Sequence, residues 1–231
     1  MRFRFNWTAI FAVTTLAACQ GGSASLETDD EIVSYGFGLD IGRSLEPTVN
    51  HLDRAALARG IEDALDGRDP AISPEQLAEV TQRVGMLIQE EQNAVFEATT
   101  ESNGAEGEAY LASNAERDDV TVTDSGLQYE VILAGEAGGA RPTPVNQVTI
   151  HYRGTLIDGT EFDNSYSRGQ PATFGVTGVI PGFSEGLQLM TVGSHYRFVI
   201  PSDMAYGPQG SGPVIGPNAA LIFEIELIEV L

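Results

Sequence analysis

The spacing of apolar residues changes near residue 120, and this change limits the fold more than any other feature of the sequence. Before it, apolar residues recur at helical intervals, as in Leu57, Ile61 and Leu65. After it, apolar and polar residues alternate over short runs, as in 148–153, and turn residues separate the runs. The sequence therefore predicts a helical N-terminal part followed by a β-rich C-terminal domain.

Four segments of the N-terminal part have helical periodicity. They are 32–45, 53–65, 73–99 and 108–115. The third has a strong start signal, because Ser73 can cap the first turn and Pro74 suits the first helical position. Between the last two segments, Gly104 and its neighbours favour a break. The pattern fits one helix from Pro74 to about Glu116, and it fits equally a helix that is interrupted near Gly104.

The C-terminal part combines several strands with one helix. Alternation predicts strands at 148–153, 196–200 and 220–231, and the pair Asp158-Gly159 predicts a hairpin turn. One helical segment starts at Pro181. This composition predicts an α+β fold, in which an antiparallel sheet wraps on a short helix.

The first 18 residues have the features of an export signal. Arg2 and Arg4 precede an apolar stretch, 7–16, that is too short to span a bilayer as a helix. Leu16-Ala17-Ala18-Cys19 resembles the bacterial lipobox, in which the cysteine is lipidated. The alternative is an ordinary secretory signal followed by an unmodified cysteine. We favour lipidation at Cys19, because this residue is the chain's one cysteine and lies where cleavage is expected.

The residues after the signal indicate the cellular location of the chain and its attachment to the membrane. Residues 19–30 are rich in Gly and Ser and then acidic, which predicts a flexible tether. Gln20 after the cysteine resembles the sorting signal of outer-membrane lipoproteins. No later stretch approaches the length of a membrane span. We therefore expect a protein of the bacterial cell envelope that faces the periplasm and is attached to the membrane by its lipid anchor alone.

Charge and composition exclude several functions. The chain has 33 acidic and 12 basic residues and a net charge of -21, which argues against binding nucleic acid. A single cysteine excludes an intrachain disulfide and a zinc site made of thiolates. The three histidines have no metal-ligand spacing. We expect neither a metal nor a cofactor.

Short motifs of the C-terminal half occur in a characteristic order. They are Ser125-Gly126-Leu127-Gln128-Tyr129, Val148-Thr149-Ile150-His151-Tyr152-Arg153-Gly154, Gly159-Thr160-Glu161-Phe162-Asp163-Asn164-Ser165, Val179-Ile180-Pro181-Gly182-Phe183, Ala205-Tyr206-Gly207 and Leu221-Ile222-Phe223-Glu224-Ile225-Glu226-Leu227. In order and spacing they resemble the FKBP-type peptidyl-prolyl cis-trans isomerases, or rotamases. A set this long is more specific than any single short signature.

The N-terminal part resembles one branch of that family, the macrophage infectivity potentiator lipoproteins. The resemblance covers 34–65 and a C-terminal segment, 213–218. It implies a helical dimerisation domain with a connecting helix at 31–119, an isomerase domain at 120–231, and a homodimer. The alternative is that the helical module folds back onto the C-terminal domain.

The same resemblance assigns a proline pocket. It implies catalytic roles for Phe162, Asp163 and Tyr206, with Asp163 beside the twisting amide and Tyr206 donating to a substrate carbonyl. The substrate-binding residues that it implies are Tyr152, Val179, Ile180, Phe183, Ile215, Phe223 and Arg168. The backbone N–H of Ile180 would hold a second carbonyl. Relatives usually have tryptophan where this chain has Phe183.

Pattern alone leaves simpler interpretations open. Phe162, Ile180 and Phe223 could be core residues, and Asp163 and Tyr206 could be turn residues. The family resemblance favours an isomerase that assists the folding of exported, proline-containing proteins and binds macrolide FKBP inhibitors. The alternative is a non-catalytic holdase chaperone with a degenerate pocket.

Overall fold

A computed structural model describes residues 26–231, which form two compact units. The first unit runs to Val84 and the second from Gly85 to Leu231. The first contains α1 (Asp29–Ser44), η1 (Glu46–His51), α2 (Arg54–Leu65) and the start of α3 (Pro74–Ala115). The second contains the rest of α3 and the β-rich domain. The export signal and Cys19 lie outside the described residues.

The predicted N-terminal helices are present, and their caps explain where they start. Thr28 and Glu31 form a reciprocal capping box at the start of α1. Asp53 accepts hydrogen bonds from the N–H groups of Ala55 and Ala56, both at 2.9 Å, at the start of α2.

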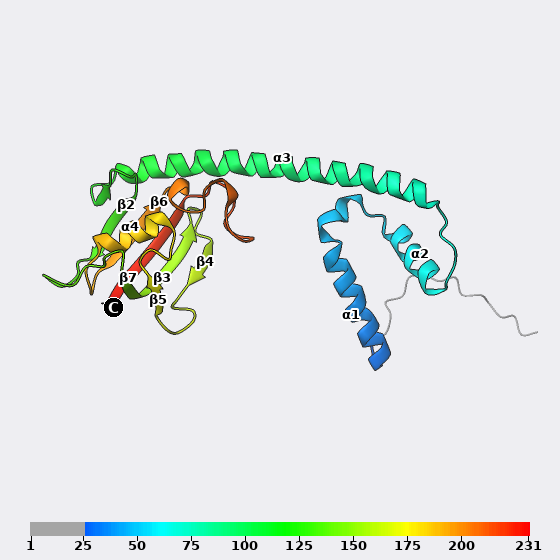
Figure 1. Cartoon of the computed structure of the whole chain (residues 1–231), viewed down its shortest axis with the longest axis horizontal. Helices are drawn as coiled ribbons and strands as arrows, with labels where there is room; N and C mark the ends of the chain where they lie inside the picture. Colours follow the sequence, from blue (N-terminus) through cyan, green and yellow to red (C-terminus); the bar gives the residue numbers. More distant parts are fainter. Residues whose placement is uncertain (1–25) are drawn as a thin grey trace, which may run out of the picture. The chain divides into compact units, whose positions relative to one another are not determined.

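α3 is one helix of 42 residues (Figure 1). The hydroxyl of Ser73 accepts a hydrogen bond from the N–H of Gln76 at 3.2 Å, as the cap predicted from sequence requires. Of the two alternatives for Gly104, the continuous helix is the one found. Glycine costs about 1 kcal/mol relative to alanine inside a helix. This stretch of α3 packs against residues 216–220 of the β-rich domain, and that packing offsets the cost.

The β-rich domain is built on one antiparallel sheet of seven strands. The strands are β1 (Val120–Val122), β2 (Gln128–Leu133), β3 (Gln147–Leu156), β4 (Glu161–Asn164), β5 (Ala172–Gly175), β6 (His195–Ile200) and β7 (Leu221–Val230). Their order is β1-β2-β6-β7-β3-β4, and β5 also pairs with β3. β3 therefore contacts three other strands, and one of its residues can meet side chains from two of them.

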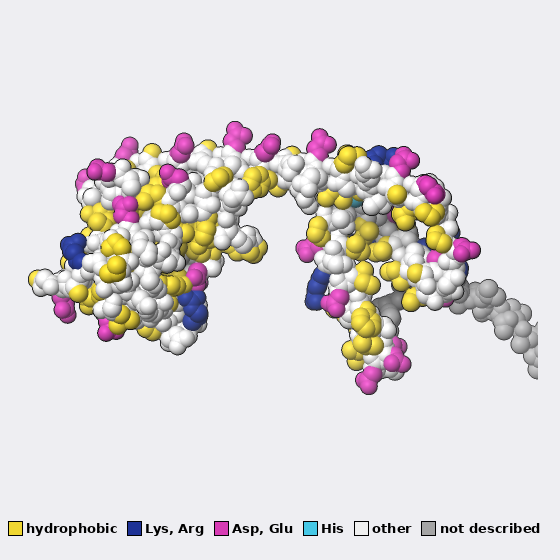
Figure 2. Space-filling model, viewed as in Figure 1, with side chains coloured by type: hydrophobic (Ala, Val, Ile, Leu, Met, Phe, Trp, Pro, Cys, Tyr) yellow, Lys and Arg dark blue, Asp and Glu magenta, His cyan; other side chains and the backbone are white. Residues whose placement is uncertain are grey.

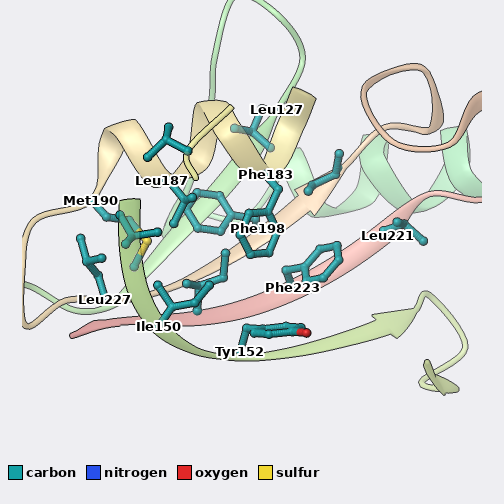
Figure 3. Close-up of a cluster of buried hydrophobic side chains, with 14 of the residues drawn as sticks. Leu127, Ile150, Tyr152, Phe183, Leu187, Met190, Phe198, Leu221, Phe223 and Leu227 are labelled. Carbon is teal, nitrogen blue, oxygen red and sulfur yellow. The ribbon is translucent and has the colours of Figure 1, made fainter. Parts of the chain in front are cut away.

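α4 (Pro181–Leu189) packs on one face of this sheet, as predicted (Figure 1). Figure 3 shows Phe183 and Leu187 of α4 lying over Phe198 and Phe223 of the sheet. The fully buried residues of this core include Leu127, Val148, Ile150, Leu187, Met190, Phe198, Ile200, Leu221 and Ile225.

Short elements also connect the strands, among them η2 (Ser202–Met204) and η3 (Gly207–Gln209). Within residues 26–231, every helix is either too short or too polar to cross a membrane.

Candidate active site

A pocket of about 670 Å³ opens between the sheet, α4 and the segment that precedes β7. Its size is in the range of small-molecule and peptide side-chain sites. The residues that line it are Tyr152, Phe162, Asp163, Phe174, Gly178, Val179, Ile180, Phe183, Tyr206, Ser211, Gly212, Pro213, Val214, Ile215 and Phe223. The lining is mainly apolar and aromatic, and it comes from segments far apart in the chain.

Aromatic rings form the floor and one wall of the pocket. The ring centroids of Phe183 and Phe223 are 4.9 Å apart and the rings are perpendicular. Phe162 meets Phe223 at 5.5 Å, also edge to face, and Tyr152 meets Phe183 at 6.1 Å. Such edge-to-face pairs are favourable beyond the area they bury. The rings therefore hold one another in place around the cavity.

Gly154 of β3 makes this ring packing sterically feasible. It lies opposite Phe223 of β7 and opposite Asp163 of β4. A Cβ atom at residue 154 would lie 2.5 Å from the ring of Phe162 and 2.8 Å from that of Phe223. Only glycine fits between the two rings here, so the motif glycine of β3 is needed for the pocket wall.

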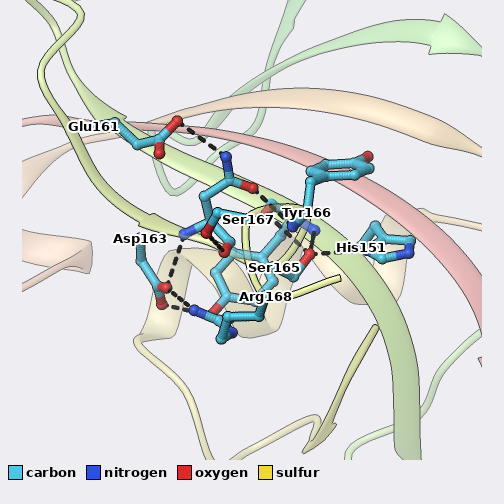
Figure 4. A network of polar contacts seen from close by, with 9 residues as sticks. His151, Glu161, Asp163, Ser165, Tyr166, Ser167 and Arg168 are labelled. Atoms are coloured by element: carbon cyan, nitrogen blue, oxygen red, sulfur yellow. Dashed lines mark hydrogen bonds and ion pairs between the residues drawn. The ribbon is translucent and has the colours of Figure 1, made fainter. Parts of the chain in front are cut away.

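One ionised carboxylate lies at the pocket, and both of its oxygens are occupied. The hydroxyl of Tyr152 donates to Oδ2 of Asp163. Arg168 donates to Oδ1 at 2.5 Å, and the N–H of Asn164 donates to the same atom at 2.8 Å (Figure 4). Arg168 also donates to the Tyr152 hydroxyl at 2.8 Å. The three side chains form a closed, charge-assisted network.

This network shifts two pKa values in opposite directions. Partial burial raises the pKa of Asp163, but the hydrogen bonds from Tyr152 and Arg168 lower it more, so the net shift is downward. Burial raises the pKa of Tyr152, and the hydrogen bond to Asp163 raises it further. Asp163 is therefore a carboxylate and Tyr152 a neutral phenol at neutral pH.

Ser165, a buried residue next to this network, joins strand β3 to the loop that follows β4. The hydroxyl of Ser165 accepts a hydrogen bond from the N–H of Tyr152 at 2.9 Å and lies 3.0 Å from Nδ1 of His151. The N–H of Ser165 donates to the carbonyl of Tyr152 at 2.9 Å. Ser165 is completely buried. It joins β3, which carries Tyr152, to the loop that carries Arg168.

The residues predicted from sequence come together, with one difference in position. Phe162, Asp163 and Tyr206 line the pocket, and so do the predicted binding residues Tyr152, Val179, Ile180, Phe183, Ile215 and Phe223. Arg168 is not part of the lining and contacts the pocket through Asp163 and Tyr152. Cys19, the predicted lipidation site, lies outside the described residues.

Sequence reasoning missed several lining residues and the buried serine. Phe174 of β5 packs its ring 5.6 Å from that of Tyr152, and Val214 lies in the segment before β7. A usable sequence signal was the alternation of Ala172 and Phe174 with Thr173 and Gly175, and the structure leaves Ala172 and Phe174 half-buried in β5. The role of Ser165 had no local signal, since its partners lie 13 or 14 residues away.

The arrangement suits binding and distortion better than bond cleavage. The pocket presents apolar rings, a carboxylate whose oxygens already accept hydrogen bonds, and the hydroxyl of Tyr206 at its exposed edge. An apolar, rigid ring of a ligand would fit such a lining. The described pocket residues therefore indicate recognition of a compact apolar group.

Comparison with known proteins identifies the family. Residues 138–228 match the family model for FKBP-type peptidyl-prolyl cis-trans isomerase, and residues 30–131 match the model for the domain amino terminal to FKBP-type peptidyl-prolyl isomerase. The chain is 39% identical to "Outer membrane protein MIP" of Legionella longbeachae over 231 residues, which is 100% of this chain and 98% of that protein.

Two further relatives support the same family. The chain is 44% identical to the "FKBP-type 22 kDa peptidyl-prolyl cis-trans isomerase" of Escherichia coli strain K12, over 90% of this chain and 98% of that one. The crystal structure of FkpA from Escherichia coli matches with a TM-score of 0.67 and 35% identity, over 89% of this chain and 98% of that one. These relatives support an isomerase over a non-catalytic holdase. The chain belongs to the FKBP-type peptidyl-prolyl cis-trans isomerases of the Mip and FkpA kind and is an enzyme of that class.

Proposed function

We propose that the aromatic pocket is the site where this isomerase binds a prolyl residue and rotates the peptide bond before it. The observation that carries the proposal is the ring cluster of Phe162, Phe183 and Phe223 beside the Asp163 carboxylate. Phe183 and Phe223 form the floor for the prolyl ring, and Phe162 forms a wall. No covalent bond has to break in this reaction.

The physical basis is the resonance of the amide. Rotation about an X-Pro bond faces a barrier of about 18–20 kcal/mol, because the planar amide is stabilised by resonance. The twisted amide has lost that resonance and is less polar than the planar one. A water-poor apolar pocket therefore favours the twisted form, and a decrease of about 5–6 kcal/mol in the barrier gives roughly ten-thousandfold acceleration.

Polar groups at the pocket edge orient the substrate. We assign to the Tyr206 hydroxyl and to the backbone N–H of Ile180 the task of donating to substrate carbonyls that flank the prolyl ring. Asp163 lies beside the rotating amide as a fixed negative charge, and Arg168 and Tyr152 hold it there. Interactions with remote parts of the peptide supply the energy for holding the twisted bond.

A protease-coupled assay with a proline peptide tests these roles. Phe162→Ala and Asp163→Ala are expected to lower kcat/KM at least tenfold with unchanged far-UV circular dichroism, because the wall or the fixed charge is lost. Val145→Ala, at a residue that is 92% exposed, is the control. A macrolide FKBP inhibitor should compete with the peptide. Full activity in both pocket variants would show that the reaction takes place elsewhere.

We also propose that the first unit forms a homodimer. α1 has no buried residue, although it carries many large apolar side chains (Figure 2). Its exposed apolar residues are Ile32, Val33, Tyr35, Phe37, Leu39 and Ile41. An apolar surface of this extent marks a site of association. Folding of the module back onto the isomerase domain, the alternative from sequence, would also cover this surface, but it would leave the chain a monomer.

We further propose an envelope location and exported, proline-containing proteins as substrates. The name of the Legionella longbeachae relative places that protein at the outer membrane. For this chain the proposal is lipidation at Cys19, a tether at 19–30, a dimerisation part at 31–119 and an isomerase domain at 120–231. Radiolabelled palmitate should label the full chain in cells but not Cys19→Ser. Equal labelling of both would refute the anchor.

A further inference from the structure

A loop of residues 210–218, the pocket loop, closes one side of the pocket. Its inner side supplies Ser211, Val214 and Ile215 to the pocket lining. Two backbone hydrogen bonds join Ser211 and Ile215, at 2.8 and 3.2 Å, and so fix the tip of the loop. Asn218, which has a positive φ of 55°, ends the loop and donates its N–H to the carbonyl of Gly207 at 2.9 Å.

The outer side of the pocket loop lies against α3. The side-chain amide of Asn103 donates to the carbonyl of Pro217 at 2.8 Å, although the two residues are 114 positions apart. Pro217 is buried and Asn103 is half-buried. Asparagine is a poor residue for a helix interior, because its side chain competes for backbone hydrogen bonds. Its presence in the middle of α3 is accounted for by this contact.

Glycine on the loop makes the contact sterically allowed. A Cβ atom at Gly216 would lie 2.8 Å from Nδ2 of Asn103 and 3.6 Å from a methyl group of Thr99. The amide therefore reaches the Pro217 carbonyl only because residue 216 has no side chain. One turn further along α3, a Cβ at Gly107 would lie 3.3 Å from that of Ala220. The helix therefore packs closely against the pocket loop at Gly216 and against the chain just after it at Ala220.

We propose that Asn103 is a positioning residue for the isomerase, which holds the pocket loop from behind and so sets the place of Ile215 in the pocket wall. The hydrogen bond ends on Pro217, two residues after Ile215. Without it the loop keeps its own two hydrogen bonds but loses the hydrogen bond that ties it to α3. The proposal rests on the proposed function of the pocket, and it gives α3 a role in positioning the pocket wall, although α3 itself does not line the pocket.

Kinetics of the full chain give the first test. Asn103→Ala and the near-isosteric Asn103→Asp, which cannot donate, should each raise KM for a proline peptide about fivefold with kcat within twofold. That factor corresponds to about 1 kcal/mol, the usual net value of one hydrogen bond. A pure KM effect is expected, because the loop contributes to binding of substrate and twisted state alike. Asn93→Ala, on the exposed part of α3, is the control.

A double-mutant cycle separates the contact from general destabilisation. Gly216→Ala should impair the enzyme in the wild-type background, because the new methyl group displaces the Asn103 amide. In the Asn103→Ala background the same methyl group has room, so its additional effect should vanish. Equal effects of Gly216→Ala in both backgrounds, or an unchanged KM in Asn103→Asp, would overturn the proposal.

Hydrogen exchange tests the attachment independently of catalysis. The amides of Ser211 and Ile215 should exchange at least several-fold faster in Asn103→Ala, while those of β3 and β7 stay unchanged. Unchanged exchange at the loop would refute the positioning role. Faster exchange with no change in KM would instead show that Asn103 holds the loop but that the proposed prolyl site does not use it.

Discussion

The hydroxyl of Tyr152 and the carboxylate of Asp163 are hydrogen-bonded across the wall of the pocket, from neighbouring strands of one sheet. Arg168 contacts both groups. These two donors keep Asp163 ionised and hold its carboxylate next to the aromatic floor.

The first prediction concerns the pH dependence of activity. The pKa of Asp163 in the folded protein is below its ordinary value, so the carboxylate stays ionised in the enzyme until the pH falls through that lowered pKa. Wild-type activity should therefore be flat from neutral pH down to mildly acidic pH. Tyr152→Phe removes one hydrogen bond, so the acid limb of kcat/KM should move to higher pH.

The control for this shift is Tyr166→Phe, which removes a hydroxyl that bonds to Glu226 away from the pocket. Its acid limb should coincide with that of the wild type. A Tyr152→Phe profile with an unmoved acid limb would show that the phenol does not help to keep Asp163 ionised.

The second prediction concerns Gly154. In Gly154→Ala the new methyl group would lie within 3 Å of the rings of Phe162 and Phe223, so at least one ring must move. We expect kcat/KM to fall about a hundredfold, with overpacking lowering stability by about 1–3 kcal/mol. A peptide assay and urea denaturation measure the two effects. Gly175→Ala is the matched control, because a Cβ at that strand glycine meets nothing within 4 Å.

The third prediction concerns Ser165. In Ser165→Ala the buried N–H of Tyr152 loses the acceptor provided by the serine hydroxyl. An unsatisfied buried group costs about 1–3 kcal/mol, which urea denaturation should detect. We also expect a lower kcat, because Ser165 no longer holds the strand of Tyr152 against the loop of Arg168. Ser167→Ala, which removes an exposed serine hydroxyl from the same loop, should leave both quantities unchanged.

The fourth prediction concerns association. Tyr35→Glu with Phe37→Glu places two charges on the apolar surface of α1, where both residues are more than half exposed. Light scattering should then give the monomer mass, while activity on a short peptide stays at the wild-type level. Val145→Glu is the control for adding charge at an exposed apolar residue. A wild-type chain that is already monomeric would contradict the dimer.

Most helices and strands could be predicted from the sequence, because each depends on the local periodicity of apolar residues. The helical spacing of Leu57, Ile61 and Leu65 predicted α2, and the alternation around Val148 predicted β3. The start of α4 at Pro181 was also readable, since proline suits the first turn of a helix. These signals lie within a few residues of the elements that they specify.

The pocket residues were predicted by a different route. Apolar residues such as Phe162 and Phe223 have no local sign that separates a pocket wall from an ordinary core. The order of the motifs, and the family that this order resembles, supplied the distinction. The structure then brought these residues together and placed Arg168 behind the lining.

By itself, the sequence determined the helical and strand segments, the α+β class and the set of motif residues at the pocket. Only the tertiary structure decided that α3 continues through Gly104, that Ser165 joins β3 to the loop of Arg168, and that Asn103 reaches Pro217. The physical reason is distance along the chain. A glycine or an asparagine in a helix is unfavourable locally, and its compensation comes from a partner that only the folded topology brings within contact.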